Sequence, residues 1–245
     1  MTKLNINKIG NNDKTLVFLH GWGFNQLIWK SLLPKLMEQF SIYLIDLPGF
    51  GQSSLMNWEK FKAELLNHLP KQVALVGWSL GGLFATRLAI EEPKRISHLI
   101  NVASSPYFIK DTYWPGINQQ TLAQFYTNLS QNPEKTTAEF IALQLQNFSL
   151  NTFDIKSEVF SSSKEALANG LNILANWDLR PSLNQLISQT CYMFGRLDAI
   201  VPRHLLPRMQ ELYPQFNYIL FPKAAHMPFI THQADFIDKL RSFVL

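Results

Sequence analysis

The chain has 245 residues, of which 47% are hydrophobic, and a formal net charge of +4. This length and apolar content predict one large α/β domain with at most a modest insertion, and they exclude an intrinsically disordered chain. The charge is mild and no long block of lysines or arginines occurs, so nothing indicates a nucleic-acid-binding protein.

The cellular compartment is indicated by what the chain lacks. Its first residues have no apolar segment of the kind found in signal peptides, and no stretch approaches the roughly 20 apolar residues that a membrane-spanning helix needs. The single cysteine, Cys191, lies in an apolar run, and we interpret it as a buried core residue rather than a reactive thiol. We therefore expect a cytoplasmic, monomeric protein without a membrane partner.

Short apolar runs alternate with helical patterns over the first hundred residues. Strands are expected at 16–20, 41–47, 73–76 and 96–102, and helices at 28–39, 58–69 and 80–91. Apolar runs of this length, separated by helices, are typical of a mostly parallel sheet that is covered on both faces. The fold class is therefore α/β, with a doubly wound sheet.

This alternation is interrupted between residues 110 and 177. Helical spacing continues there at 121–129, 136–146 and 164–175, without a convincing strand. Strands are expected again at 190–194 and 218–221, and helices at 204–212 and 233–244. The pattern predicts a core formed by residues 1–109 and 178–245, with an inserted helical cap at 110–177.

The sequence Gly77-Trp78-Ser79-Leu80-Gly81 has the form G-x-S-x-G, with a predicted strand before it and a predicted helix after it. In that context the motif marks a sharp turn that projects a serine hydroxyl above the sheet. Such a turn needs small neighbours, which Gly77, Gly81 and Gly82 supply. We therefore predict that Ser79 is a catalytic nucleophile.

A serine hydroxyl needs a base, and the base needs a carboxylate that fixes its tautomer. Of the six histidines, only His226 follows the last predicted strand in a loop. Asp198 follows the preceding strand, and the order Ser79, Asp198, His226 is that of α/β-hydrolases. The rival carboxylate, Asp46, precedes the serine at a Gly/Pro turn, and we interpret it as structural.

Two backbone amides are candidates for an oxyanion hole. The N–H of Leu80 follows the nucleophile, and the N–H of Trp22 lies between two glycines in the loop after the first predicted strand. We also expect the Trp22 side chain to form a wall of the substrate pocket. No metal-binding motif or dinucleotide fingerprint occurs, so neither a metal nor a cofactor is expected.

Several segments together resemble the BioH family, the pimeloyl-[acyl-carrier protein] methyl ester esterases of the α/β-hydrolase superfamily. The broadly shared segments are Leu19-His20-Gly21-Trp22-Gly23, Asp46-Leu47-Pro48-Gly49-Phe50-Gly51, the motif around Ser79 and Lys223-Ala224-Ala225-His226. The narrower ones are Ser104-Ser105-Pro106, Trp114-Pro115-Gly116-Ile117, Phe140-Ile141-Ala142-Leu143-Gln144 and Asp178-Leu179-Arg180. The resemblance covers nearly the whole chain.

The resemblance implies a carboxylesterase that removes methanol from methyl-pimeloyl-[acyl-carrier protein] in biotin biosynthesis and leaves the thioester intact. It also implies that substrate is contacted by Trp22, Ser79, Leu80, His226 and the segment Phe140, Ile141, Ala142, Leu143 and Gln144. From chemistry alone, Trp22, Trp78, Phe140 and Leu143 are apolar surfaces that suit a linear acyl chain, although Phe140 and Leu143 are equally compatible with packing inside the cap.

The partner implied by the family, an acyl-carrier protein, is acidic. The predicted cap, however, has four lysines against six acidic residues. The candidate docking residues are therefore Lys135, Lys156, Arg196 and Arg203, with Lys164 as a weaker one and Glu139 expected beside the cap lysines.

Two other functions remain open from the sequence. One is a carboxylesterase or lactonase of broad specificity that acts on small esters, because a fold does not determine a substrate. The other is a ligand-binding receptor that has kept the hydrolase scaffold, although all three catalytic positions are filled. Dehalogenase chemistry is disfavoured because position 79 is serine and not aspartate.

Overall fold

A computed structural model describes residues 3–145 and 162–245. Its centre is a seven-stranded sheet in the order β1-β3-β2-β4-β5-β6-β7, in which β1 pairs antiparallel with β3 and the other neighbours pair in parallel. The strands are β1 (Ile6–Ile9), β2 (Thr15–Leu19), β3 (Ser41–Ile45), β4 (Val73–Trp78), β5 (Ile96–Val102), β6 (Gln189–Gly195) and β7 (Asn217–Phe221). The predicted α/β class with a mostly parallel sheet is confirmed.

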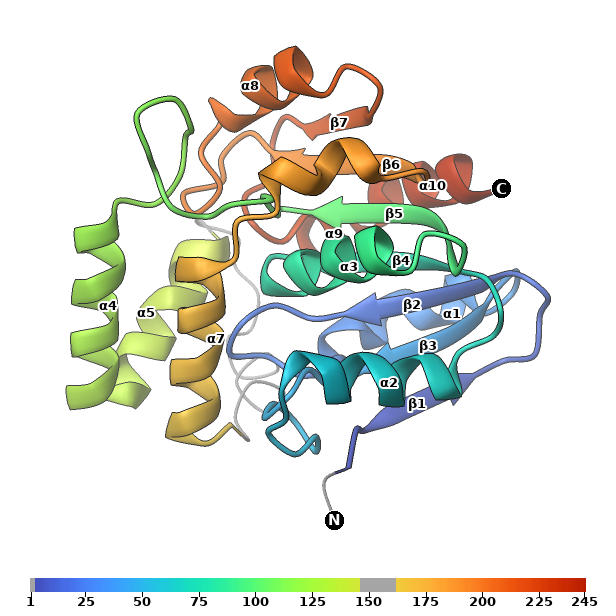
Figure 1. Ribbon diagram of the computed structural model, residues 1–245, viewed down its shortest axis with the longest axis horizontal. Coiled ribbons are helices and arrows are strands. Elements are labelled where there is room, and N and C mark those ends of the chain that lie inside the picture. The colour runs from blue at the N-terminus through green and yellow to red at the C-terminus, as the bar shows by residue number, and fades with distance from the viewer. Residues whose placement is uncertain (1–2, 146–161) are drawn as a thin grey trace.

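Helices cover both faces of the sheet (Figure 1). One face is covered by α2 (Trp58–His68), α3 (Leu80–Glu91) and α8 (Leu205–Leu212), and the other by the 3₁₀ helix η1 (Gln26–Leu32), α1 (Leu33–Leu36), α9 (Pro228–Thr231) and α10 (Gln233–Val244). Strand β2 shows why both faces are needed. Val17 and Leu19 belong to one buried cluster, whereas Leu16 and Phe18 belong to the other, because successive strand side chains point to opposite faces.

Three elements differ from the sequence expectations. Strand β1 was not expected, because it is an edge strand of four residues without a fully buried side chain. The helix expected at 28–39 is divided into η1 and α1, with Pro34 in the first turn of α1. The short helix α9 after His226 was not expected either.

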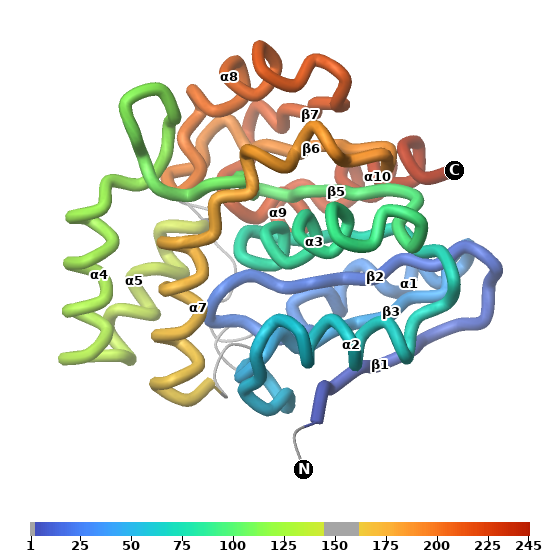
Figure 2. Tube along the Cα trace, viewed as in Figure 1, coloured from blue at the N-terminus to red at the C-terminus, as the bar shows by residue number. Residues whose placement is uncertain are grey.

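A group of helices lies at the end of the sheet toward which the parallel strands point. The chain leaves the sheet after β5, forms α4 (Gln119–Gln131) and α5 (Pro133–Leu145), and returns through α7 (Lys164–Asn176) and the 3₁₀ helix η2 (Arg180–Gln185) to β6 (Figures 1 and 2). We refer to α4, α5 and α7 as the cap helices. The bounds 110–177 for the whole cap stay a prediction.

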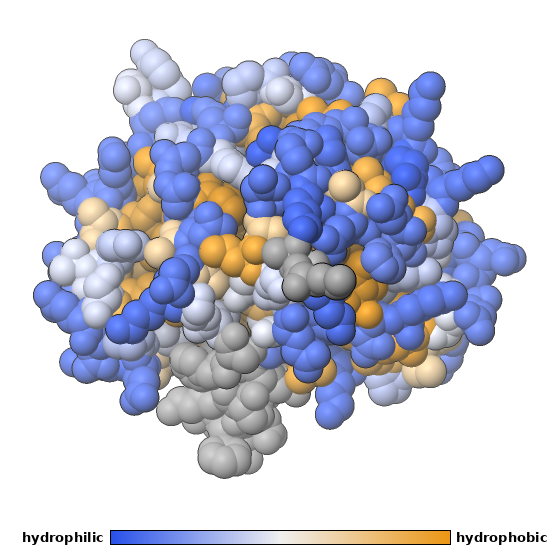
Figure 3. All heavy atoms as spheres, turned by 60° about the horizontal axis from the view of Figure 1, so that its bottom comes forward, coloured by the Kyte–Doolittle hydropathy of each residue, from blue (hydrophilic) through white to orange (hydrophobic). Residues whose placement is uncertain are grey.

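The outer surface of the cap helices is partly apolar, as the left side of Figure 3 shows. A surface groove of about 740 Å³ runs between α4 and α7, and its lining, which includes Leu122, Tyr126 and Leu171, contains no charged side chain. None of the helices in the described ranges combines the length and the apolar character that crossing a bilayer requires.

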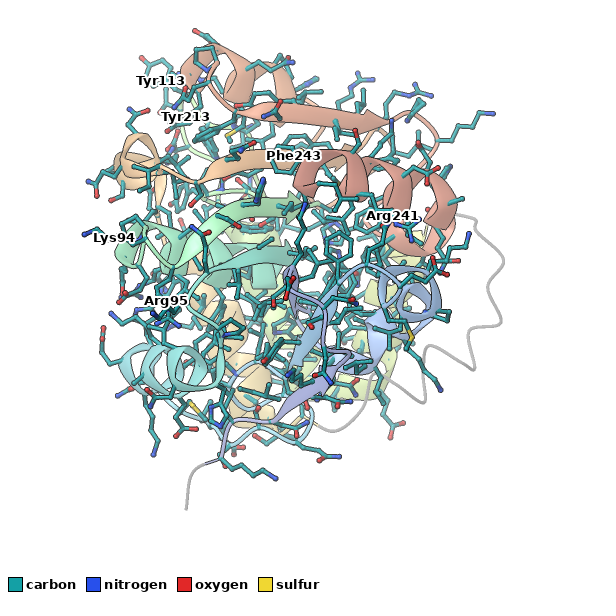
Figure 4. All side chains as sticks on the ribbon, turned by 90° about the vertical axis from the view of Figure 1, so that its right-hand side faces the viewer. Lys94, Arg95, Tyr113, Tyr213, Arg241 and Phe243 are labelled. Atoms are coloured by element: carbon teal, nitrogen blue, oxygen red, sulfur yellow. The ribbon has the colours of Figure 1, made fainter. Side chains whose placement is uncertain are left out.

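The opposite end of the sheet is fastened by polar contacts. Arg95, labelled in Figure 4, lies before β5 and donates hydrogen bonds to the carbonyl oxygens of Leu66, Leu69 and Lys71. These bonds connect the end of α2 to the start of β4 and β5.

Cys191 in β6 has no exposed area, and burial raises the pKa of its thiol to about 12, which confirms its interpretation as a core residue.

Candidate active site

Ser79 lies in the sharp turn between β4 and α3. Its backbone has a positive φ of 53° with ψ of −117°, a conformation that costs a non-glycine residue about 1–3 kcal/mol. Neighbouring groups hold it there: the Ser79 N–H donates to the carbonyl of Val102 at 3.0 Å, and its own carbonyl accepts from the Ser104 hydroxyl at 2.8 Å.

The glycines around Ser79 are required by close backbone contacts. A Cβ atom at Gly77 would lie 2.4 Å from the carbonyl oxygen of Gly81, and one at Gly81 would lie 2.3 Å from that of Leu19. At Gly82 it would meet the Ser104 hydroxyl at 2.2 Å. The turn therefore packs as its G-x-S-x-G sequence indicates, with the start of α3 directly against the end of β2.

His226 and Asp198 come from the loops that follow β7 and β6. His226 Nδ1 lies 2.7 Å from Asp198 Oδ2, and each side chain is only 1% exposed. The other carboxylate oxygen accepts the N–H groups of Ile200 and Val201 at 2.8 and 3.0 Å. The carboxylate thus has a fixed orientation, and it holds the imidazole in the tautomer that carries its proton on Nδ1.

The second imidazole nitrogen, His226 Nε2, is buried and has no hydrogen-bond partner among the described residues. In this tautomer Nε2 is the acceptor, the atom that takes a proton from a serine hydroxyl in a triad. The His226 backbone is held close to the Ser79 turn, because its carbonyl accepts a hydrogen bond from the indole of Trp78 at 2.9 Å.

A glycine that the sequence analysis did not single out brings the two loops together. A Cβ atom at Gly195 would lie 2.0 Å from the carbonyl oxygen of Ala225, next to His226. The N–H of Leu197 also donates to the carbonyl of Ala224 at 2.9 Å. Gly195 lies between a predicted strand and the predicted acid, and this position was the signal that could have identified it.

The two candidate oxyanion donors lie on adjoining segments. Leu80 is the first residue of α3, where a helix leaves its N–H groups without an acceptor of its own. Trp22 lies in the loop after β2, and the preceding residues contact the start of α3: the missing Cβ of Gly81 would also lie 2.6 Å from the His20 carbonyl oxygen.

The Trp22 side chain joins the core to the cap helices. It is 2% exposed, and its indole Nε1 donates to the carbonyl of Leu167 in α7 at 2.9 Å. Its ring lies edge-on to Phe125 of α4 and Phe140 of α5, each with a centroid distance of 5.4 Å. The Trp22 side chain therefore connects the core to the cap helices, while its backbone N–H is a candidate oxyanion donor.

An apolar cavity of about 140 Å³ lies between the cap helices and the core. Its lining consists of Trp22, Phe108, Ile117, Thr121, Leu122, Phe125, Phe140, Leu143, Leu171, Leu174, Ala199 and Ile200. Apart from the Trp22 indole N–H, which is bonded to Leu167, Thr121 has the only polar side-chain group of this set, and no side chain in it is charged. Ala199 and Ile200 directly follow Asp198, so the cavity adjoins the loop after β6 that contains Asp198, which we call the acid loop.

The five consecutive residues expected to contact substrate do not share one face of α5. Phe140 and Leu143 line the apolar cavity. Ile141 is 3% exposed and belongs to the buried cluster below the cap, and Gln144 is 1% exposed, with its carbonyl accepting the N–H of His226 at 3.2 Å. Ala142 is exposed.

Trp78 does not belong to this apolar surface. The expectation that its side chain would accompany an acyl chain is wrong, because it has no exposed area and packs against Phe24 and Phe229 below the turn. The residue before the nucleophile is the last residue of a buried strand, so its side chain enters the core.

Asp46 has the structural setting that the sequence indicates. Its carboxylate accepts the backbone N–H groups of Gln26 and Gln52 at 2.8 and 2.9 Å and the Asn5 side-chain amide at 2.7 Å. It therefore joins three loops and contacts none of the three predicted triad residues. Within the residues that the structure describes, no group of His, Cys, Asp or Glu side chains could hold a metal ion.

The candidate docking residues occupy different surfaces. Lys135 is on α5 and lies 3.9 Å from Glu139, with both side chains largely exposed. Arg196 and Arg203 are exposed on the acid loop, and Arg203 lines a surface groove of about 640 Å³ together with Lys110 and His204. Lys156 lies outside the described residues.

Comparison with known proteins places these observations in a family. Residues 14–233 match a family model described as the alpha/beta hydrolase fold. A pimeloyl-[acyl-carrier protein] methyl ester esterase of Legionella pneumophila (strain Corby) is 49% identical over 229 residues, which cover 94% of each chain. One of Klebsiella pneumoniae is 42% identical over 241 residues, which cover 95% of this chain and 94% of the relative.

Solved structures support the fold. An esterase from Exiguobacterium antarcticum superposes with a TM-score of 0.91 at 20% identity, over 99% of this chain and 96% of that one. A bromoperoxidase from Bacillus anthracis superposes with a TM-score of 0.90 at 23% identity, over 99% and 95%. At such identities the likeness shows the architecture and not the reaction.

Proposed function

Because the chain belongs to the α/β-hydrolases and, within them, to the pimeloyl-[acyl-carrier protein] methyl ester esterases, the BioH family, we propose that it hydrolyses the methyl ester of pimeloyl-[acyl-carrier protein]. The products are methanol and pimeloyl-[acyl-carrier protein], and the thioester to the carrier protein stays intact. Membership of this family makes the chain a carboxylic ester hydrolase. The substrate and the roles of individual residues are the proposal, as is its action in biotin biosynthesis as a cytoplasmic monomer.

The observation that carries this proposal is the uncharged apolar lining of the cavity between cap and core. A methyl-capped chain can enter such a cavity, and each buried methylene contributes about 0.8 kcal/mol. A free carboxylate cannot be held there without a partner, because burying an unpaired charge is costly. The cavity thus favours the neutral ester over its acidic product, which supports both substrate selection and product release.

The first half of the proposed reaction forms an acyl-enzyme. His226 Nε2 takes the proton of the Ser79 hydroxyl as its oxygen attacks the ester carbonyl, and the amides of Leu80 and Trp22 hold the resulting oxyanion. The imidazolium, stabilised by Asp198, then gives its proton to the departing methoxide, which leaves as methanol.

The second half returns the enzyme to its starting state. His226 takes a proton from a water molecule, whose oxygen attacks the acyl-Ser79 carbonyl and passes through the same oxyanion site. The proton on His226 then returns to the Ser79 oxygen as the bond to the acyl group breaks. The carboxylic acid formed in this way loses its proton to water, and the resulting carboxylate leaves the uncharged cavity.

A mass measurement tests the substrate. Methyl-pimeloyl-[acyl-carrier protein] is incubated with the enzyme or with Ser79→Ala. The proposal is supported if the carrier-protein substrate loses the mass of one methylene and keeps its thioester with the parent enzyme but not with Ser79→Ala. Turnover by the purified variant would contradict the nucleophile, and an unchanged carrier protein beside rapid hydrolysis of small esters would favour a broad carboxylesterase.

The carrier-protein surface is tested by charge reversal. Arg203→Glu and Lys135→Glu alter two separate surfaces: Lys135 lies beside Glu139 on α5, and Arg203 lies on the groove that Asp198 also lines. We expect one of them to raise the KM for the carrier-protein substrate while hydrolysis of a nitrophenyl ester stays unchanged. Unchanged KM values in both variants would exclude docking through either residue.

A further inference from the structure

Trp78 is a fully buried side chain to which the proposed reaction assigns no role. It is the last residue of β4 and directly precedes Ser79. It has no exposed area and does not line the apolar cavity between the cap helices and the core, so it cannot touch a substrate held there. Its contacts therefore have to explain why an indole occupies this position.

One contact of Trp78 is with the backbone of the proposed base. Its Nε1 donates to the carbonyl of His226 at 2.9 Å, and the two rings lie with a centroid distance of 5.7 Å. The N–H of His226 is held in turn by the carbonyl of Gln144. Both backbone polar groups of His226 thus have fixed partners, one from the nucleophile strand and one from the cap.

The other contact is with the candidate oxyanion loop. A Cβ atom at Gly21 would lie 2.9 Å from Cε3 of Trp78 and 3.0 Å from Cζ3, so the indole lies against the backbone at this residue. Gly21 directly precedes Trp22. A single side chain therefore contacts the base loop and the oxyanion loop, and it is covalently next to the nucleophile.

We propose that Trp78 is a positioning residue, which sets His226 and the loop containing Trp22 at their working distances from Ser79. This inference rests on the proposed function of these three residues. Displacing a catalytic group by about 1 Å can cost about 10²-fold in rate. Losing the indole leaves the chemistry in place but loosens the geometry, so it lowers kcat more than it changes KM.

The chain offers a matched control for removing the indole. Trp29 belongs to the same buried cluster, has no exposed area and lies with its ring centroid 6.4 Å from that of Trp78. Its Nε1 has no hydrogen-bond partner among the described residues. Trp78→Phe and Trp29→Phe therefore remove the same atoms from one cluster, but only the first breaks a bond to His226.

The experiment compares both variants with the parent in thermal stability, in kcat and KM for a nitrophenyl ester, and in the rate of Ser79 labelling by a fluorophosphonate. We expect Trp78→Phe to lower kcat and the labelling rate by about 10-fold to 10²-fold, with KM close to the parent value. Trp29→Phe should lose similar stability while keeping its kcat. Equal kcat in the two variants would overturn the inference.

A second pair of variants keeps the test valid where stability is lost. Gly21→Ala inserts a methyl group against the Trp78 ring and should lower kcat by itself. In a Trp78→Phe background the two nearest ring atoms, Cε3 and Cζ3, are gone, so the same substitution should cost less, and the two effects should not be additive. Additive effects would contradict the contact. Absence of Ser79 labelling in the parent would instead refute the proposed function.

Discussion

The backbone carbonyl of Gln144 accepts a hydrogen bond from the N–H of His226, with 3.2 Å between the two atoms. Gln144 belongs to cap helix α5, whereas His226 belongs to a core loop that lies far along the chain, after β7. The same helix presents Phe140 and Leu143 to the apolar cavity. The wall of the proposed acyl site and the backbone of the proposed base are thus parts of one connected structure.

Replacing the acid of the triad should remove activity without unfolding the protein. In Asp198→Asn the side-chain oxygen can still accept from Ile200 and Val201, but the amide now donates toward His226 Nδ1 and favours the wrong tautomer. We expect kcat to fall by about 10⁴-fold, with little change in melting temperature. Steady-state kinetics and calorimetry check this, and a variant that keeps its activity would show that Asp198 is not the acid.

The two faces of α5 predict different effects for adjacent residues. Phe140→Ala removes a cavity wall, so kcat/KM for the pimeloyl ester should fall by about 10-fold to 10²-fold, because the acyl chain then buries less apolar surface against the enzyme. Ile141→Ala should instead lower the free energy of unfolding by about 2–5 kcal/mol, because the side chain is buried in the core cluster.

Kinetics with esters of several chain lengths, together with urea unfolding, separate these effects. Phe140→Ala should lower kcat/KM for long acyl esters more than for acetate esters. Ile141→Ala should leave the ratio of these two kcat/KM values unchanged. A similar change of the ratio in both variants would mean that the substrate contacts the helix differently.

Much of the core and the composition of the site could be predicted because they depend on local signals. The buried parallel strands are short apolar runs, and Ser79 is marked by glycines that the tight turn requires. His226 and Asp198 follow strands whose carboxyl ends share one edge of the sheet. In each case a few neighbouring residues determine the outcome.

The remaining features depend on partners that are distant in the sequence. Strand β1 exists because Ile6 to Ile9 pair with β3, and nothing in its own pattern reveals that pairing. The role of the Gln144 carbonyl could not be predicted, because it depends on a backbone atom and not on the side chain. Trp78 was misplaced because its identity does not show whether it faces the cavity or the core.

Arg180 should anchor the cap to the core. Its guanidinium lies 2.6 Å from both Asp111, between β5 and α4, and Asp178, between α7 and η2. It also stacks over the rings of Tyr107 and Trp114 at 4.3 and 5.1 Å, and its carbonyl accepts from Tyr213, labelled in Figure 4. The Arg180 side chain is 23% exposed, so solvent weakens these ion pairs.

Arg180→Met should lower the free energy of unfolding by about 1–2 kcal/mol. Arg180→Lys should recover only part of this, because a lysine cannot bind two carboxylates with a planar fork. Arg208→Met serves as the control, since Arg208 pairs with Glu211 one turn away on the same helix, a kind of pair worth only about 0.3–0.5 kcal/mol. Urea unfolding measures all three, and equal losses for Arg180→Met and Arg208→Met would contradict the anchoring role.

His20 should make stability depend on pH, because it is buried and neutral beside the oxyanion loop. Its Nδ1–H donates to the Gly21 carbonyl at 2.8 Å, and its Nε2 accepts the N–H of Leu47 at 3.0 Å. Burial lowers the pKa of His20 below its ordinary value of 6.5, and the Asp46 carboxylate and the Gly21 carbonyl offset this only in part. As the pH falls, the unfolded chain therefore takes up the proton before the folded chain does.

The contribution of His20 is accordingly complete above pH 6.5 and is lost as the pH falls from there to its folded-state pKa. His20→Gln cannot titrate, so its free energy of unfolding should decline less steeply between about pH 7.5 and pH 5, although the variant is less stable overall. His98, whose pKa is also lowered by burial and by Lys14, is present in both proteins and cancels in the comparison. Urea titrations across this range measure the two slopes, and parallel slopes would show that folding leaves the pKa of His20 unchanged.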